Sequence, residues 1–378
     1  MTGKALSRPY FNVINYGAKA DGKTDMSLAL INAWKDACAS KVSSTILIPK
    51  GRFLLGPVLL VGPCRSQIEF RNEGIVMAPM NPVIFKGGSW INFRYITGLT
   101  ISGGGVFDGR GQVAWAKNDC KRNPHCQQLP ISFRFDFMKN TLVKDITSLN
   151  SKNFHMNLFK CQGMIMQNIK IKAPGDSPNT DGIHIGDSSF ISITHSVIGT
   201  GDDCISLGPG SRNISITNVF CGPGHGISIG SLGKYQNEED VVGITVRDCT
   251  LSGTTNGLRI KTWPDSPPGF ASDLTFENII VKNVYNPVIV DQEYCPYYKC
   301  DQKGPSLVKL KNVKFSNIRG TSSSNLAVKI VGSKAAPVEL QIGDINLLYY
   351  GKEGPATSIC YNAKAYLSGR QNPLTCAH

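Results

Sequence analysis

The chain has 378 residues, of which 41% are hydrophobic and 18% charged, as in ordinary globular proteins. No apolar run approaches the roughly 18 residues of a membrane-spanning helix, which argues against a helical membrane protein. The formal charge of +13 favours a polyanionic partner, and acidic polysaccharide suits a secreted chain better than nucleic acid does.

Secretion is expected from the cysteines. Twelve cysteines in one chain, without paired Cys-x-x-Cys zinc spacing, are typical of an oxidising compartment. The opening Met1-Thr-Gly-Lys-Ala5 contains no hydrophobic signal core, so we expect that a signal peptide has been removed. Asn213-Ile-Ser215 is a candidate acceptor for N-glycosylation, which also fits the secretory route.

One segment near the start of the chain shows helical periodicity. Leu28 and Ile31 begin an apolar stripe shortly after Thr24 and Asp25, both of which are suitable N-caps. We predict a short helix over about residues 24–40.

Most of the remaining chain alternates short runs of Ile, Val and Leu with Gly, Asn, Asp and Ser, which predicts many short strands. A first series of alternations recurs at intervals of 205 − 183 = 22 and 227 − 205 = 22 residues, and then at longer intervals, as expected if loops are inserted in one place per repeat. Its members are Ile183-His-Ile185, Ile205-Ser-Leu207, Ile227-Ser-Ile229, Leu258-Arg-Ile260 and Val288-Ile-Val290.

A second series, from Ile191-Ser-Ile193 to Val308-Lys-Leu310, runs beside the first, so each repeat carries at least two strands. Stacked coils of this kind predict an all-β fold, a right-handed parallel β-helix that forms a single domain over residues 1–378. Leucine-rich repeats, the main alternative, need a Leu-x-x-Leu-x-Leu frame that is absent. The predicted helix is expected to cover the apolar N-terminal coil.

The end of the chain is expected to depart from the repeat. From about Ser333 the alternation is lost, so we predict that residues 333–378 form a tail over the far end of the stack. Cys360 and Cys376 lie close in sequence within it and are candidates for a disulfide that holds the tail.

Three polar tripeptides stand immediately before three strands of the first series: Asn179-Thr-Asp181, Gly201-Asp202-Asp203 and Gly224-His225-Gly226. Because neighbouring strands lie about 4.8 Å apart, equal offsets bring three carboxylates and one imidazole onto one patch. Crowded carboxylates raise each other's pKa values at a cost in stability, whereas glycosidic hydrolysis needs a protonated carboxyl beside a carboxylate. The alternative is that these aspartates only cap turns.

Two cations follow on the next strand of the series. Arg259 and Lys261 alternate with Leu258 and Ile260, which places both cations on the outward face. There they are suited to bind the carboxylate of a uronic acid sugar, although an ordinary solvated pair is the simpler alternative.

In this order, Asn179-Thr-Asp181, Gly201-Asp202-Asp203, Gly224-His225-Gly226 and Arg259-Ile-Lys261 resemble the four signature motifs of polygalacturonases, the family 28 glycoside hydrolases. The opening Phe11–Asp25 resembles that of plant members, so the likeness spans nearly the whole chain, which as a whole most resembles the plant, pollen-type exopolygalacturonases. The resemblance implies a secreted enzyme of the cell wall that hydrolyses α-1,4 bonds of polygalacturonic acid, the backbone of pectin, with inversion and in an exo manner. We expect no cofactor and no metal, no nucleic acid or membrane partner, and a monomer.

The resemblance also implies roles for individual residues. Asp202 would be the general acid, while Asp181 and Asp203 would hold and activate the hydrolytic water. His225 would support the protonation of the acid and contact the substrate, and Arg259 with Lys261 would bind the uronate carboxylate. Tyr294 is a candidate for a tyrosine that lines the same subsite, although a packed surface aromatic is nearly as good an interpretation. Inversion predicts carboxyl separations of about 6.5–9.5 Å across the bond.

Several cysteines are candidates for bridges. Cys204 follows the acid pair and Cys221 precedes His225, so a disulfide between them would brace these coils. The short loops Cys120–Cys126 and Cys295–Cys300 are also candidates, whereas Cys161 and Cys249 are expected to be free and buried.

Other functions remain open from the sequence. A calcium-dependent lyase is disfavoured because calcium prefers oxygen ligands and gains nothing from the imidazole of His225. A non-catalytic pectin-binding wall protein is another alternative, and it would bind the polymer without releasing sugar. Endo action and a rhamnogalacturonan or xylogalacturonan substrate are further alternatives, since the exo assignment depends on loops such as Lys234–Asp240.

Overall fold

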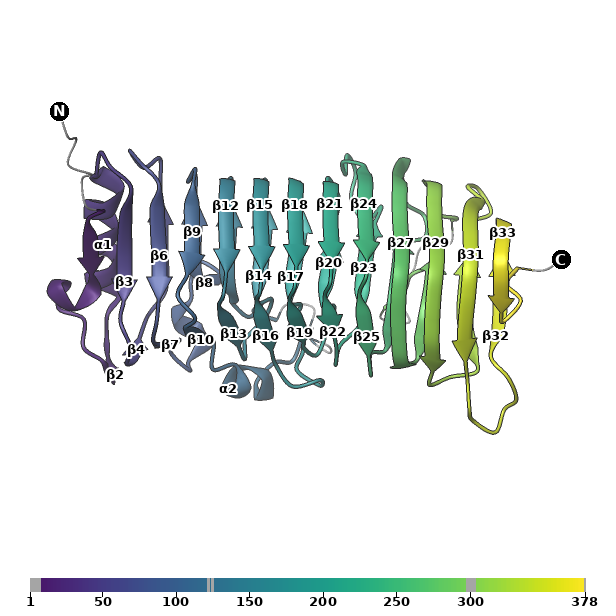
Figure 1. Cartoon of the computed structure of the whole chain (residues 1–378), viewed down its shortest axis with the longest axis horizontal. Helices are drawn as coiled ribbons and strands as arrows, with labels where there is room; N and C mark the ends of the chain where they lie inside the picture. The colour runs from purple at the N-terminus through teal and green to yellow at the C-terminus, as the bar shows by residue number, and fades with distance from the viewer. Residues whose placement is uncertain (1–7, 121–122, 124–125, 297–303, 377–378) are drawn as a thin grey trace, which may run out of the picture. The chain divides into compact units, whose positions relative to one another are not determined.

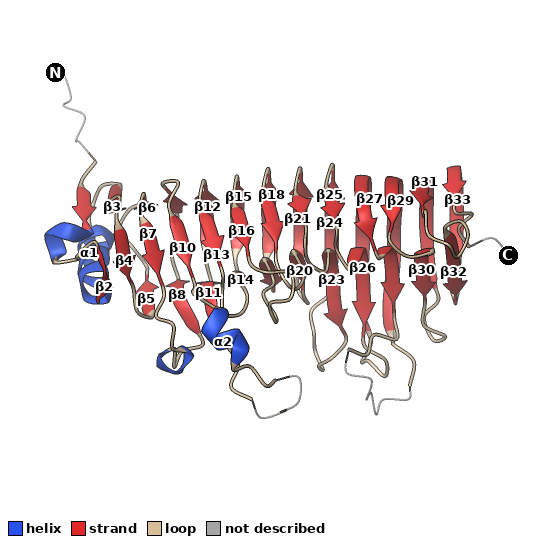
Figure 2. Cartoon of the chain, turned by 90° about the horizontal axis from the view of Figure 1, so that it is seen from below, coloured by secondary structure: helices blue, strands red, loops and turns tan. Residues whose placement is uncertain are grey.

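The computed structural model describes residues 8–120, 123, 126–296 and 304–376. The chain forms two compact units, Met1–Ala173 and Pro174–His378. In each of them short parallel strands are stacked coil upon coil as a parallel β-helix, with strands far more abundant than helices (Figure 1, Figure 2). The fold class predicted from the repeats is therefore confirmed, and the single-domain organisation stays a prediction.

The first unit contains the helix near the N-terminus and parallel strands that pair with the next coil. One of its ladders runs β5, β8, β11 and β14, and others pair β12 with β15 and β10 with β13. Its elements are β1 (Tyr10–Asn12), η1 (Val13–Tyr16), β2 (Asp21–Asp25), α1 (Ser27–Ala39), β3 (Ser44–Ile48), β4 (Arg52–Leu54), β5 (Val58–Val61), β6 (Ile68–Asn72), β7 (Ile75–Met77), η2 (Pro82–Ile84), β8 (Ser89–Arg94), β9 (Leu99–Ser102), β10 (Val106–Asp108), α2 (Gln112–Ala116), β11 (Ile131–Asp136), β12 (Lys139–Lys144), β13 (Thr147–Leu149), β14 (Met156–Phe159), β15 (Gln162–Gln167) and β16 (Lys170–Lys172).

The second unit continues with the same type of coil. Figure 1 shows β18, β21 and β24 side by side, and the register pairs these strands residue by residue. The elements are β17 (Ile183–Gly186), β18 (Ser189–Thr194), β19 (Val197–Gly199), β20 (Ile205–Leu207), β21 (Arg212–Thr217), β22 (Phe220–Cys221), β23 (Ile227–Leu232), β24 (Val241–Arg247), β25 (Thr250–Ser252), β26 (Asn256–Thr262), β27 (Gly269–Val284), β28 (Asn286–Asp291), β29 (Val308–Ser322), β30 (Leu326–Val331), β31 (Val338–Leu348), β32 (Thr357–Tyr361) and β33 (Ala363–Asn372).

Helix α1 is the predicted helix near the N-terminus, with Leu30, Ala33 and Trp34 on its buried face. It lies beside β1 and β3 at the start of the first unit (Figure 1). The predicted N-caps are wrong, because Met26 occupies the cap position without a side-chain hydrogen bond. The hydroxyl of Thr24 instead donates to Asp21 within the preceding strand, while Asp25 accepts from the first helical N–H at 2.9 Å.

The repeat does not end near Ser333, contrary to the sequence-based expectation. β31 pairs with β29, and β32 with β30, in the same parallel manner as the earlier coils. The alternation Val338-Glu-Leu-Gln-Ile342 buries every second side chain and so continues the core. Cys360 and Cys376 are joined by the predicted disulfide.

Among the described residues, no helix is long and apolar enough to span a membrane. The predicted bridge Cys120–Cys126, outside the candidate site, is present, and Cys161 and Cys249 are buried as expected. The sequence reasoning missed a bridge between Cys38 at the end of α1 and Cys64. The predicted Cys295–Cys300 pair involves Cys300, which lies outside the described residues.

Candidate functional site

The first series of alternations forms one ladder in the second unit. Ile183, Ile205, Ile227 and Leu258 are successive register partners on β17, β20, β23 and β26, and all four are completely buried. The three polar tripeptides therefore stand at equivalent places in adjacent coils, as the 22-residue spacing predicts. Every candidate residue of the site belongs to this unit.

Glycine makes the bend before β23 possible. Gly226 has a φ of +83°, and a Cβ there would lie 2.2 Å from the carbonyl oxygens of Asn256 and Gly257 in the next coil. Only glycine tolerates this backbone conformation and this close approach. The bend leaves His225 37% exposed beside the strand, where it reaches Asp202.

Asp203 is the most firmly held of the three carboxylates. Its Oδ1 accepts hydrogen bonds from Arg259 Nη2 at 2.7 Å and from Ser228 Oγ at 2.7 Å, and its Oδ2 accepts from Lys261 Nζ at 2.9 Å. Burial by itself would raise the pKa of Asp203, but the charges of Lys261 and Arg259 outweigh it and hold the pKa at about 2. Asp203 is therefore a carboxylate at any pH of physiological interest.

Asp181 lies in a different electrostatic setting. It is 6% exposed, and its Oδ2 accepts a hydrogen bond from Ser206 Oγ at 2.8 Å. Burial raises the pKa of Asp181 well above its ordinary value, and the negative charges of Asp202 and Asp203 raise it further. The Ser206 hydroxyl is 2.7 Å from His184 Nδ1, and burial lowers the pKa of His184 to about 4, so this imidazole is neutral near pH 7.

Asp202 is the most accessible of the three, with 24% of its side chain exposed. Its Oδ1 accepts from the backbone N–H of Asp203 at 2.8 Å and lies 3.0 Å from His225 Nδ1. Within the described ranges, Oδ2 of Asp202 accepts no hydrogen bond. This second oxygen is therefore available to carry a proton toward a ligand.

The spacing of two of these carboxyls is shorter than inversion leads one to expect. A carboxylate oxygen of Asp202 and one of Asp203 lie within 4.8 Å, against the roughly 6.5–9.5 Å predicted across the bond. The two residues are consecutive, and the backbone N–H of Asp203 donates to Oδ1 of Asp202 at 2.8 Å, which turns the Asp202 carboxylate toward Asp203. By this criterion Asp203 is not the base that faces Asp202 across the bond, and Asp181 is the remaining candidate for that base.

The two cations alternate with buried Leu258 and Ile260 as predicted, yet they are not solvated. The side chains of Arg259 and Lys261 are only 11% and 9% exposed, because they pair with Asp203. The Tyr294 ring lies 5.3 Å from Lys261 Nζ, and burial raises the pKa of its hydroxyl. Tyr294 therefore belongs to the same cluster as the candidate site.

Three polar residues of the site were missed from the sequence: His184, Ser206 and Ser228. All three occupy the middle position of an Ile-x-Ile or Ile-x-Leu alternation, the same outward position as Arg259. Each of them hydrogen-bonds to an aspartate or to the serine that holds it. The shared register position was the available signal.

A disulfide lies next to the candidate site in the chain. Cys204, directly after the acid pair, is joined to Cys221, and both are completely buried. The bridge closes a loop of 17 residues and links the coil of Asp202 to the coil of His225, as predicted. Asn213, the candidate glycosylation residue, is exposed on β21, so a glycan there stays a prediction.

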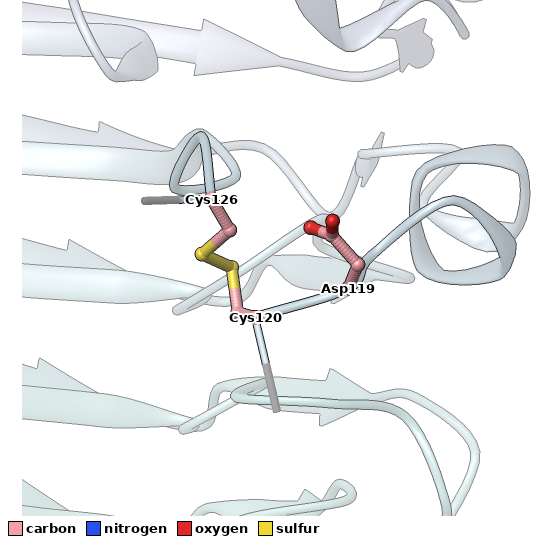
Figure 3. Close-up of side chains that lie close together, drawn as sticks. All are labelled: Asp119, Cys120 and Cys126. Atoms are coloured by element: carbon pink, nitrogen blue, oxygen red, sulfur yellow. A yellow bond between two sulfur atoms is a disulfide. The ribbon is translucent and has the colours of Figure 1, made fainter. Parts of the chain in front are cut away.

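Two clusters of possible metal ligands occur within the described residues, and neither suits a metal ion well. The donor atoms of Asp202, Asp203 and His225 lie within 4.8 Å of one another, but both oxygens of Asp203 already accept from cations. Figure 3 shows the other cluster, in which Cys120 and Cys126 form a disulfide beside Asp119. Their sulfurs are consumed by the bridge and cannot act as thiolate ligands.

Comparison with known proteins places this geometry in a family. The family model for glycosyl hydrolases family 28 matches residues 38–372. The exopolygalacturonase of Platanus acerifolia is 55% identical over 378 residues, with 99% of this chain and 100% of that protein covered. A polygalacturonase of Gossypium hirsutum is 48% identical over 375 residues, covering 99% of this chain and 92% of that protein.

Solved structures of similar fold include enzymes that act on galacturonans. The endo-xylogalacturonan hydrolase of Aspergillus tubingensis superposes with a TM-score of 0.80 at 25% identity, covering 93% of this chain and 98% of that one. A polygalacturonase of Erwinia carotovora gives a TM-score of 0.77 at 25% identity, covering 96% of this chain and 99% of that one. The chain therefore belongs to glycosyl hydrolase family 28 and is a glycoside hydrolase.

Proposed function

We propose that this enzyme hydrolyses the α-1,4 bonds of polygalacturonic acid with inversion, acts from a chain end and releases galacturonic acid. The observation that carries the proposal is the cluster of Asp181, Asp202 and Asp203, whose three carboxyls stand in three different environments within two adjacent coils. Divergent environments for neighbouring carboxyls are what acid–base catalysis requires. Relatives named exopolygalacturonase, from Platanus acerifolia and Oenothera organensis, support the exo assignment.

Asp202 is the proposed general acid. Its Oδ1 is held by a backbone N–H and by His225, while its Oδ2 is directed to no partner within the described residues. A proton on Oδ2 can therefore pass to the leaving glycosidic oxygen without first breaking a hydrogen bond inside the protein. His225 contributes by fixing the orientation of this carboxyl.

Asp181 and Asp203 have different roles toward the attacking water. A base is effective when its pKa lies near the working pH, and the raised pKa of Asp181 brings it closer to that range. Asp203, with a pKa of about 2, is a poor proton acceptor but a constant negative charge. In the proposed reaction Asp181 takes the proton of the water as it attacks the anomeric carbon, and Asp203 orients that water.

Arg259 and Lys261 are proposed to bind the carboxylate of the sugar at the cleaved bond. Both are nearly buried, so a uronate that reaches them loses its water and gains strong charge-assisted hydrogen bonds. Their pairing with Asp203 holds them in place before the substrate arrives. Tyr294 is proposed to line the same subsite beside Lys261.

The proposed place of action is the extracellular cell wall, where galacturonan occurs. Four disulfides within the described residues fit an oxidising compartment, and the charge of +13 fits a polyanionic substrate. We further propose that the enzyme works as a single domain and a monomer without a cofactor.

The test is a digestion of polygalacturonic acid in the presence of a chelator, with products separated by size and ultraviolet absorbance recorded. Galacturonate monomer without absorbance is the expected result. Mixed oligomers would replace exo by endo action, an absorbing product would indicate a lyase, and binding without any product would indicate a non-catalytic pectin-binding protein.

A further inference from the structure

A second cluster of cations on the first unit is not used by the proposed mechanism. It lies on β8 and β11, where Arg94 is the register partner of Asp136, and Asn92 that of Arg134. The alternating residues Phe133 and Phe135 are completely buried, so Arg134 and Asp136 belong to the outward face of the strand.

Asp136 holds two arginines at once. Its Oδ2 accepts from Arg94 Nη2 at 3.0 Å and from Asn92 Nδ2 at 3.2 Å, and its Oδ1 accepts from Arg134 Nε at 2.8 Å. The carboxylate is 1% exposed, whereas the arginine side chains are 35% and 34% exposed. One arginine is enough to neutralise this carboxylate, so the second leaves a net charge of +1 that faces solvent.

The guanidinium groups are positioned but not saturated. Each carries five N–H groups, and Asp136 uses only Nε and Nη2 of Arg94 and Nε of Arg134. Beside them, Oδ1 of Asn92 is buried and has no hydrogen-bond partner within the described residues. A buried polar atom without a partner costs free energy unless a ligand or water supplies a donor.

Aromatic rings border the arginines. Tyr95 follows Arg94 in the chain, and its ring stacks on that of Phe137 with centroids 4.8 Å apart and an angle of 20°. Phe137 also contacts Phe159, which is the register partner of Asp136 on β14. Tyr95 is 51% exposed, so the stack places an exposed aromatic ring on the residue that follows Arg94.

We infer that Arg94 and Arg134, together with the Tyr95–Phe137 stack, form a second carbohydrate-binding site that takes a uronate unit of an acidic polysaccharide. The planar guanidinium fork matches a carboxylate, and a sugar site combines aromatic surface with a few fixed polar groups. The site adds affinity for the polymer and takes no part in bond cleavage. The class of ligand rests on the proposed function, whereas the site itself rests on this geometry.

The test variant replaces the whole charged set, as Arg94→Gln, Arg134→Gln and Asp136→Asn, so that no buried charge is left without a partner. Binding of polygalacturonate is measured by calorimetry in an Asp202→Asn background, which prevents digestion. We expect Kd to rise about tenfold or more, as for loss of one charge-assisted hydrogen bond. In the active background, KM is expected to rise with kcat unchanged, because the lost binding is the same in the ground state and the transition state.

The matched control is Arg319→Gln, which also removes one net positive charge from an exposed strand position. Tyr95→Ala provides a second variant that leaves every charge in place and is expected to weaken binding of both polygalacturonate and its methyl ester. The charge variant should leave binding of the methyl ester unchanged.

A Kd for polygalacturonate within twofold of the parent in both the charge variant and Tyr95→Ala would overturn the site, as would an equal loss in Arg319→Gln. The two proposals fail separately. Weakened binding without any released sugar would sustain this site and refute the proposed hydrolysis, whereas normal product release with unchanged Kd would refute this site alone.

Discussion

Replacement of Lys261 by Met tests the electrostatic account of the candidate site most fully. The substitution keeps a straight apolar stem and removes the ammonium group that donates to Asp203 Oδ2 at 2.9 Å. Because both partners are nearly buried, breaking this pair is expected to cost about 3–5 kcal/mol in the free energy of unfolding near pH 7.

Part of that loss of stability depends on pH, and the lowered pKa of Asp203 determines the direction of the dependence. Its pKa falls from 3.8 to about 2 on folding, so a lowered native pKa contributes about 1.8 × 1.36, or roughly 2 kcal/mol, of stability. This contribution is complete above the unfolded pKa near 4 and disappears as the pH falls through about 2. Lys261 and Arg259 share this contribution, so the difference between wild type and Lys261→Met should shrink by on the order of 1 kcal/mol between pH 6 and pH 2.

The assay is urea unfolding at a series of pH values between 2 and 7, with Lys309→Met as control. Lys309 is exposed on β29, so its replacement is expected to change the free energy of unfolding by less than about 0.5 kcal/mol at every pH. A Lys261→Met destabilisation that is the same at pH 2 and pH 6, or no larger than that of the control, would refute the reasoning.

Three further variants probe the same site. Asp202→Asn is expected to lower kcat by about 10²–10⁴-fold with Kd for oligogalacturonate little changed, and near-normal turnover would remove Asp202 from the acid role. Ser206→Ala removes a hydrogen bond that lowers the pKa of Asp181, so the acid limb of the kcat/KM profile should move to higher pH; an unmoved limb would contradict Asp181 as the base. Loss of the 17-residue Cys204–Cys221 loop closure by double alanine substitution should cost about 3 kcal/mol in urea unfolding, and a cost under 1 kcal/mol would show that the bridge does not brace these coils.

The repeat was readable from sequence because each coil buries the same two positions. Ile183, Ile205 and Ile227 follow at 22 residues, and in the structure they are direct register partners. The position of a side chain in such a ladder can be predicted from the sequence, since the 22-residue repeat fixes which residues of the neighbouring coils lie beside it. The same 22-residue spacing predicted that Asp181, Asp202, Asp203 and His225 lie close together.

What the spacing could not supply was the direction and partner of each polar side chain. Arg259 and Lys261 were expected to be open to a ligand, yet both reach back to Asp203 across two coils. Such pairing depends on side-chain length and on the desolvation of three charges together, which no periodicity encodes. The continued repeat beyond Ser333 was missed for a simpler reason, because an inserted loop separates Leu348 from the next strand at Thr357.

The central claim is that a water molecule activated by Asp181 attacks the anomeric carbon while Asp202 protonates the leaving glycosidic oxygen. It is tested most directly by proton nuclear magnetic resonance of the first sugar released from polygalacturonate, recorded before the anomers equilibrate. Inversion at an α-linked sugar predicts that β-galacturonate appears first and that Asp202→Asn releases none in the same time. An α anomer as the first product, or an unsaturated sugar, would contradict the account.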